Sequence, residues 1–284
     1  MDNLPNLAPE PCRGSYADGF APVAERFAAQ IRDGSEVGAG LAVYQRGRCV
    51  VDLWGGSADV ANRIPWARDS RIVVFSVTKG LSAMALALLA DRGKLDWDVP
   101  VATYWPGFAA SGKQAITVRT LVNHRGGLVA IDEPLSLNDC ILPARRERLV
   151  SALERQRPAW DPGTAQGYHA ITFGLYVREL FERIAGEDLG AFLQRELFEP
   201  LAADVALGTP AELDPRVATL YSPSTPKRLL HALAAAIRPD TAEGRIARAL
   251  IGRHSLPRAA FGNPRAGREG ILVYNSTRVR RAVL

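Results

Sequence analysis

The sequence predicts an α+β protein, because an early β-hairpin precedes a long series of helical patterns in a chain of globular composition. Two β-rich runs, Gly38–Tyr44 and Cys49–Trp54, flank a polar turn that contains Gly47. Helical spacing of apolar residues dominates the remainder of the chain. The 284 residues are 47% apolar and 23% charged, which provides for a sizeable core and excludes a disordered or collagen-like chain.

The elements on either side of the hairpin follow from the same patterns. Residues 1–19 are expected to be a polar lead-in, and Gly19–Arg32 places apolar side chains at the spacing of an amphipathic helix. After the hairpin, Ile72–Phe75 is a short, apolar, strand-like approach to a helix over Val77–Asp91. Gly93 marks the end of that helix. Its residues are apolar or small almost throughout, so we expect it to be buried on all sides.

The second half of the chain contains further helical patterns. Thr117 predicts the N-cap of a short helix from Val118 to about His124, and Gly126-Gly127 predicts its end. Beyond it, apolar spacing predicts more helices and one late β-like run. These expected elements are Ala144–Gln156, Tyr168–Ala185, Leu189–Phe198, Lys227–Ile237 and, for the β-like run, Ile271–Tyr274.

Charge and cysteine content exclude several classes of function. The chain has a net charge of +5, with +8 in residues 205–284, but the arginines there are dispersed and no aromatic residues interleave them. A solvated basic face is therefore favoured over nucleic-acid binding. The longest apolar run, Leu81–Ala90, is too short for a membrane span, and the N-terminus has no secretory pattern. Three cysteines without CxxC spacing indicate neither disulfides nor zinc. A cytoplasmic location is expected.

A serine and a lysine stand three residues apart at the start of the apolar helix, in Ser76-Val77-Thr78-Lys79. Side chains at i and i+3 share a helix face with Cβ atoms about 5–6 Å apart, so the amine can reach the hydroxyl. Burial of Lys79 would favour its neutral form and make it a usable base. The helix N-terminus supplies N–H groups for a developing oxyanion. The alternative is an N-cap serine with a surface lysine, but the apolar context favours catalysis.

A tyrosine downstream is a candidate for the same site. Tyr168 follows the turn Trp160–Gly163 and is expected to open a helix, from which its phenol could bond to the serine and relay its proton. The alternative is a core tyrosine with a satisfied hydroxyl. His169 could tune this relay, although a lone histidine is more often structural, and the other histidines suggest no metal site. No serine lies in a Gly-x-Ser-x-Gly elbow, so a Ser-His-Asp triad is not favoured.

These motifs together carry a resemblance to a known family. They are, in order, Phe75–Lys79, Leu88–Asp96, Pro100 with Tyr104–Pro106, Ile116–His124, and Pro162-Gly163 to Tyr168. From about Phe20 to Leu284 the sequence resembles the β-lactamase-related serine hydrolases, which include class C β-lactamases, DD-peptidases and family VIII carboxylesterases.

The resemblance implies a three-layer, α/β penicillin-recognising fold, with an antiparallel sheet beside a helical region and residues 20–284 as the hydrolase domain. By the same resemblance, Ser76 is the acylated nucleophile, Lys79 its base and Tyr168 the proton relay. The Ser76 N–H and a second N–H from a late strand would form the oxyanion hole. The resemblance implies neither a metal nor an organic cofactor.

Two departures from the family pattern shape the functional hypotheses. Ala170 stands where the lactamases have Asn, which favours simple esters over β-lactams, and the form Gly167–Ala170 resembles the esterase-like branch. His169 and Ala170 are the candidate substrate-binding residues. The third family motif is not visible after Tyr168, and the sequence His124–Gly127 is interpreted as a helix C-cap instead. We therefore expect a C-terminally truncated chain with an incomplete sheet.

The leading hypothesis is a hydrolase of small-molecule esters that acts through a Ser76 acyl-enzyme. A catalytically impaired protein with a scaffold or self-association role, as a homo-oligomer, is the alternative. A β-lactamase or DD-peptidase is less favoured than either, and no nucleic-acid or membrane partner is expected.

Overall fold

The computed structural model describes residues 6–222, 233–235, 237–238, 240–251, 255–264 and 267–282. The chain divides into two compact units. The first comprises Met1–Val73 and Glu212–Tyr221, and the second comprises Val74–Ala211 and Ser222–Leu284. Among the described residues, every named strand belongs to the first unit, and helices make up the second. The predicted α+β class is confirmed.

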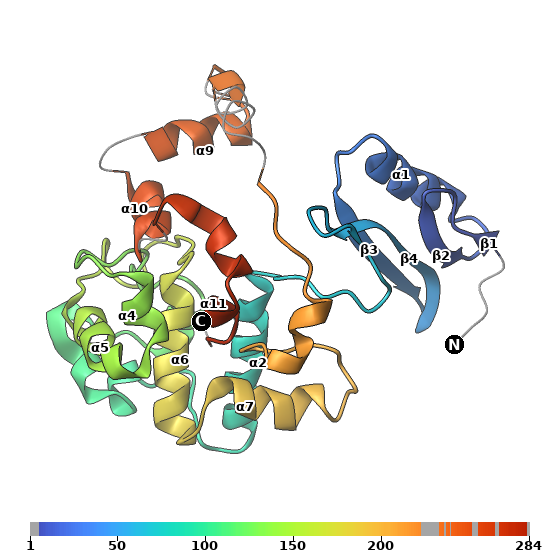
Figure 1. The fold of residues 1–284 in the computed structure, drawn as a ribbon. Helices are drawn as coiled ribbons and strands as arrows, with labels where there is room; N and C mark the ends of the chain where they lie inside the picture. The colour runs from blue at the N-terminus through green and yellow to red at the C-terminus, as the bar shows by residue number, and fades with distance from the viewer. Residues whose placement is uncertain are drawn as a thin grey trace. The chain divides into compact units, whose positions relative to one another are not determined.

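The first unit is built on an antiparallel sheet with the strand order β1-β2-β4-β3 (Figure 1). The short strand β5 pairs with the end of β4. The predicted hairpin is confirmed as β3 and β4, with Val43 opposite Val51. Arg46 and Gly47 connect them with φ values of 50° and 77°, as a two-residue turn of the I′ type requires. The strands are β1 (Asn6–Leu7), β2 (Cys12–Tyr16), β3 (Gly38–Gln45), β4 (Arg48–Asp59) and β5 (Ile64–Pro65).

Strand β2 lies inside the segment that was expected to be a polar lead-in. It pairs with β4 from Cys12 opposite Gly55 to Tyr16 opposite Val51. Helix α1 (Ala21–Arg32) matches the predicted amphipathic helix and packs against β2 and β4 (Figure 1). Phe27 is among its buried residues and belongs to the core of this unit. The sheet and one helix thus form a small core of their own.

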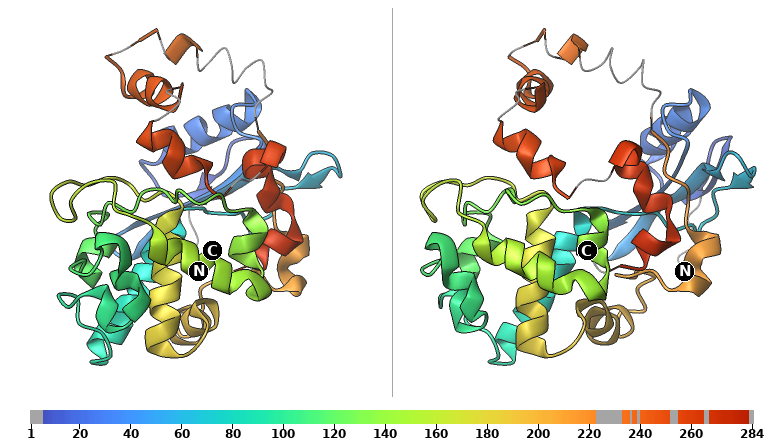
Figure 2. Two further views of the ribbon diagram at one scale, coloured as in Figure 1. Left: turned by 90° about the vertical axis from the view of Figure 1, so that its left-hand side faces the viewer. Right: turned by 60° about the vertical axis from the view of Figure 1, so that its left-hand side comes forward.

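The second unit packs helices around one larger core. Helices α2 and α6 lie side by side (Figures 1 and 2), and both contribute buried residues such as Leu86, Leu89, Tyr176 and Leu180. Its α-helices are α2 (Val77–Asp91), α3 (Val118–Val122), α4 (Leu137–Ile141), α5 (Arg146–Arg155), α6 (Thr172–Ala185), α7 (Leu189–Leu193), α9 (Ala242–Ile251), α10 (Leu256–Gly262) and α11 (Thr277–Arg280). Shorter helical turns are η1 (Val101–Thr103), η2 (Pro106–Gly112), η3 (Pro143–Arg145), η4 (Gln194–Phe198) and η6 (Gly267–Asn275), while η5 (Ala211–Arg216) lies almost wholly in the first unit.

Helix α2 begins and ends where the sequence predicted, but it is not buried on all sides. Its buried residues, which include Leu86 and Leu89, lie on the face packed against α6 and α7. Val77 is 61% exposed and Met84 is 46% exposed. The expectation of full burial was wrong because an apolar composition does not specify on how many sides a helix is covered.

Three further expectations need correction. Tyr168 does not open a helix, because the backbone on both sides of it bonds to His124 and α6 begins only at Thr172. Ile271–Tyr274 belongs to η6 rather than to a strand. Ile72–Phe75 is not a strand either, and Phe75 has a φ of 46°. The predicted helix over 227–237 lies mostly outside the described residues.

Candidate active site

Ser76 is the N-cap residue of α2, and its hydroxyl is not used for capping. The spacing of Ser76 and Lys79 brings them together as predicted, with the Lys79 Nζ 3.1 Å from the Ser76 Oγ. The serine is exposed and follows Phe75, whose left-handed backbone conformation is uncommon for a bulky residue. The ring of Phe75 in turn packs edge-on against Tyr274, with a centroid distance of 5.3 Å. An accessible hydroxyl beside an amine is what nucleophilic catalysis needs.

Lys79 is half-buried and has partners on two elements. Its Nζ donates to the backbone carbonyl of Ala170 at 2.7 Å as well as to Ser76. The same nitrogen lies 4.9 Å from the ring centroid of Tyr168 and 5.8 Å from that of Phe173. These contacts fix the amine at the point where α2 meets the segment before α6.

Tyr168 presents its phenol to the same two groups. The side chain is 48% exposed, so a substrate can reach it. Partial burial raises the pKa of Tyr168. Hydrogen bonding to Ser76 and Lys79, together with the charge of Lys79, lowers it by more, so the pKa of Tyr168 lies below the ordinary value. A phenol of lowered pKa beside a hydroxyl and an amine can pass a proton between them.

The two other predicted site residues contribute differently. Ala170 contacts Lys79 through its backbone carbonyl. His169 is fully buried, and its Nε2 accepts from the Leu128 N–H at 2.9 Å while its Nδ1 lies 2.6 Å from the Gly167 carbonyl. Burial lowers the pKa of His169 to about 4, so the ring is neutral. It has no exposed surface for a substrate and acts as an internal support of the segment that carries Tyr168.

His124 is a site residue that the sequence analysis missed. Its ring centroid lies 5.1 Å from that of Tyr168 and 5.0 Å from that of Phe173. Helix α3 ends at Val122, and the chain leaves it through His124 in a left-handed conformation with a φ of 60°. The sequence offered one signal, a histidine between a short helix and a pair of glycines, which was interpreted as a C-cap.

The backbone of Ser76 also offers a potential oxyanion donor. Within the part of the chain that the structure describes, the backbone N–H of Ser76 has no hydrogen-bond acceptor, whereas that of Val77 donates to the Val74 carbonyl. A free N–H at the N-terminus of a helix suits a developing negative charge.

No group of His, Cys, Asp or Glu side chains among the described residues has the arrangement of a metal site. None of the described helices combines the length and apolar character needed to cross a membrane.

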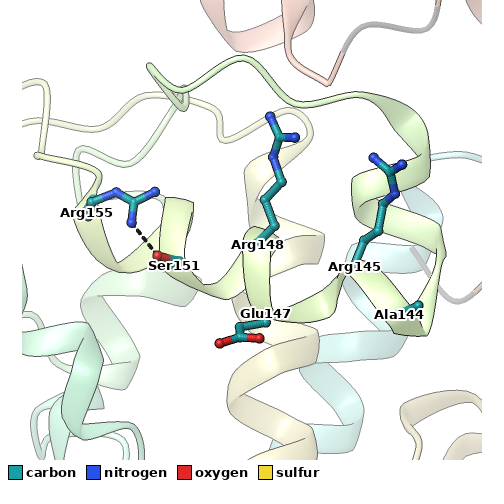
Figure 3. Close-up of a pocket in the computed structure, with 6 residues that line it drawn as sticks. All are labelled: Ala144, Arg145, Glu147, Arg148, Ser151 and Arg155. Carbon is teal, nitrogen blue, oxygen red and sulfur yellow. Dashed lines mark hydrogen bonds between the residues drawn. The ribbon is translucent and has the colours of Figure 1, made fainter.

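A separate hollow lies along α5 and η3 (Figure 3). Arg145 and Arg148 point upward in this view, Arg155 reaches sideways to Ser151, and Glu147 points away from the arginines. Arg145 pairs with the buried Asp139, and Arg155 with Glu133, while Arg148 lies within 4.0 Å of both acids. The acids compensate the arginine charges, so the hollow has the character of a surface ion-pair network.

Comparison with known proteins identifies the family of this chain. A profile of the beta-lactamase family matches residues 23–265, and the chain belongs to that family. It is 39% identical over 215 residues to the esterase/beta-lactamase LipL of Mycobacterium tuberculosis, which covers 74% of this chain and 48% of LipL. It is 27% identical over 197 residues to the esterase EstB of Burkholderia gladioli, covering 63% of this chain and 46% of EstB.

Solved structures show the same relationship. A family VIII carboxylesterase has 38% sequence identity and a TM-score of 0.67, with 74% of this chain and 57% of that chain covered. A penicillin-binding protein homologue from Caulobacter crescentus has 36% identity and a TM-score of 0.69, with 75% and 57% covered. The fold is therefore of the penicillin-recognising α+β type, and the chain spans about half the length of the relatives it matches.

Proposed function

We propose that the protein is a serine hydrolase that cleaves small acyl esters through an acyl-enzyme on Ser76. The observation that carries the proposal is the 3.1 Å separation between the Lys79 Nζ and the Ser76 Oγ. In its amine form Lys79 accepts the hydroxyl proton while the Oγ attacks the ester carbonyl carbon. Tyr168 then gives its phenol proton to the alkoxide oxygen as the alcohol leaves and takes the proton held by Lys79, so that both groups return to their starting forms. Water attacks the acyl-enzyme in the reverse sense, which releases the acid and restores the Ser76 hydroxyl.

Two observations support esters as the substrate class. The relatives named above include an esterase/beta-lactamase, an esterase and a carboxylesterase. Position 170 carries an alanine, so no side-chain amide is available there for the carbonyl group of a β-lactam substrate. The proposed specificity is therefore for simple esters.

The test is covalent labelling of the whole chain with a fluorophosphonate, read by intact mass. We expect one adduct per chain, placed on Ser76 by peptide mapping, and none on a folded Ser76→Ala variant. Lys79→Ala should label far more slowly, because an unactivated serine hydroxyl is a poor nucleophile. Undiminished labelling of Ser76→Ala, or a wild-type chain that is folded but unlabelled, would contradict the proposal.

The second candidate is a catalytically impaired protein with a scaffold or self-association role. The sequence shows no third family motif after Tyr168, and that motif would provide the second oxyanion donor. Loss of one such donor typically lowers kcat by about 10²–10³. A folded wild-type chain that takes no label would favour this candidate. Cytoplasmic location stays a prediction.

A further inference from the structure

His124 makes hydrogen bonds to the backbone on both sides of Tyr168. Its carbonyl accepts from the Gly167 N–H at 3.1 Å, and its ring Nδ1 accepts from the His169 N–H at 3.1 Å. One residue therefore holds the backbone on either side of Tyr168, at Gly167 and at His169. Since Lys79 bonds to the next residue along, Ala170, the segment is held at each of these positions.

The left-handed conformation of His124 makes this double contact possible. With a φ of 60°, the residue turns the chain out of α3 and directs its carbonyl and its ring to the same segment. On its other side the segment packs against Trp160, since a Cβ at Gly167 would lie 2.5 Å from that ring. The Trp160 Nε1–H also donates to the Ala165 carbonyl at 3.1 Å. The place of Tyr168 is thus determined by His124 and Trp160 together.

The hydrogen bond requires a neutral imidazole. If Nδ1 accepts, the ring proton is on Nε2, and a second proton would remove the acceptor. The groups that face the ring are Lys79 from α2, and Tyr168 and His169 from the segment, while α6 contributes the uncharged Phe173. Burial and the charge of Lys79 lower the pKa of His124. Protonation would place a second cation near Lys79 and release the His169 N–H.

We propose that His124 is a positioning residue that holds the Tyr168 phenol beside Ser76 and Lys79, and that it does so only in its neutral form. The inference rests on the proposed function, in which Tyr168 relays the proton. His124 itself touches no reacting atom. Its effect is transmitted through the backbone of residues 167–169 and through the contact between the two rings.

Two substitutions at position 124 separate positioning from backbone conformation. His124→Asn retains a side-chain acceptor and tolerates the left-handed conformation, and His124→Gly favours that conformation but has no side chain. We expect His124→Asn to label with the fluorophosphonate within about twofold of the wild-type rate, and His124→Gly about two- to tenfold more slowly, as the loss of one hydrogen bond implies. Asn123→Ala, at the exposed neighbouring position, should match the wild type. Equal rates for the Asn and Gly variants would overturn the inference.

The pH dependence of labelling is a second readout that a merely structural role would not change. The acid side of the wild-type profile should contain one ionisation that is missing from His124→Asn, with a pKa below that of an ordinary histidine. Identical acid limbs in the two proteins would contradict the requirement for a neutral ring.

A measurement without catalysis keeps this inference separate from the proposed function. The phenol pKa of Tyr168 can be taken from the ultraviolet titration difference between each protein and its Tyr168→Phe counterpart. We expect this pKa to rise towards its ordinary value in His124→Gly and to stay low in His124→Asn. If the wild type takes no label but the phenol behaves in this way, the proposed function fails and the positioning role stands. An unchanged phenol pKa in His124→Gly would overturn that role.

Discussion

Lys79 connects the parts of the candidate site through a single nitrogen atom. Its Nζ lies 3.1 Å from the Ser76 Oγ and 2.7 Å from the Ala170 carbonyl oxygen. The contact to residue 170 uses the backbone, so the side chain at that position can change without removing the bond. A substitution at position 170 can therefore test its proposed effect on substrate preference without removing the contacts of Lys79.

We predict that the wild type hydrolyses short p-nitrophenyl esters with a much higher kcat/KM than the β-lactam nitrocefin. Ala170→Asn should shift this ratio towards nitrocefin by about tenfold, because an added hydrogen bond to a substrate carbonyl is worth up to about 1.5 kcal/mol. Steady-state kinetics on both substrates provide the measurement. A wild-type preference for nitrocefin, or a ratio that Ala170→Asn leaves unchanged, would refute the assigned role of position 170.

For the individual residues of the candidate site, the sequence predicted the contacts that depend on local spacing. Ser76 and Lys79 are three residues apart at the start of a helix, so their proximity follows from helix geometry. The approach of Tyr168 was predicted from its turn and from the resemblance to a family. His124 is 44 positions from Tyr168, and its role depends on a left-handed backbone conformation that its residue type does not specify. The local pattern of a histidine between a short helix and two glycines indicates a helix end, but it does not specify the contact with the distant Tyr168.

Among the elements, the short helix α4 depends on its N-terminal cap. Asp139 accepts from both the N–H and the hydroxyl of Ser136, in a capping box, and from Arg145 at 2.9 Å. The preceding loop is also tied to Asn263, whose side chain donates to the carbonyls of Ile131 and Glu133. A helix of five residues has little stability of its own, so these bonds determine its position.

We predict that Asp139→Asn lowers Tm by about 2–4 °C at pH 7, the usual effect of losing a cap in a chain of this size. Ser136 and then Arg145 hold the pKa of Asp139 well below its usual range. As the pH is lowered, Asp139 is therefore protonated in the unfolded chain before it is protonated in the folded chain. The stabilisation that the Asp139 carboxylate gives the folded chain is lost as the pH falls below about 4. The Tm difference between variant and wild type should shrink over that range in calorimetric scans. Asp161→Asn, in an exposed turn, is the control, and a difference that is independent of pH would contradict the assignment.

The elements differ in how far the sequence predicted them. Helix α2 was predicted at its observed limits, because a run of helix-forming residues follows Ser76 and ends before Gly93. Strand β2 was missed, since Cys12–Tyr16 has neither an apolar run nor a clear alternation. It is a strand because it pairs with β4, 35 to 43 residues later in the chain. Such tertiary pairing overrides local preference.

For the whole molecule, the free edge of the sheet is the feature with the largest consequence. Within the described part of the chain, β3 forms ladder hydrogen bonds with β4 only. The side chains of Ala42 and Tyr44 on this strand are exposed, and no charged side chain lies between Gly38 and Gln45. Exposed strand edges without charges or proline are sites at which chains pair with one another.

We therefore predict that the chain self-associates in a concentration-dependent manner, with the edge of β3 in the interface. Ala42→Lys should shift the mass measured by light scattering towards the monomer, because a lysine ammonium would have to be desolvated on pairing. Val23→Lys is the matched control, since it adds the same charge at an exposed apolar position on α1, away from that edge. A monomer at every concentration, or equal effects of the two substitutions, would show that the edge does not pair. A monodisperse wild-type monomer with esterase activity would further show that the sheet is protected in another way.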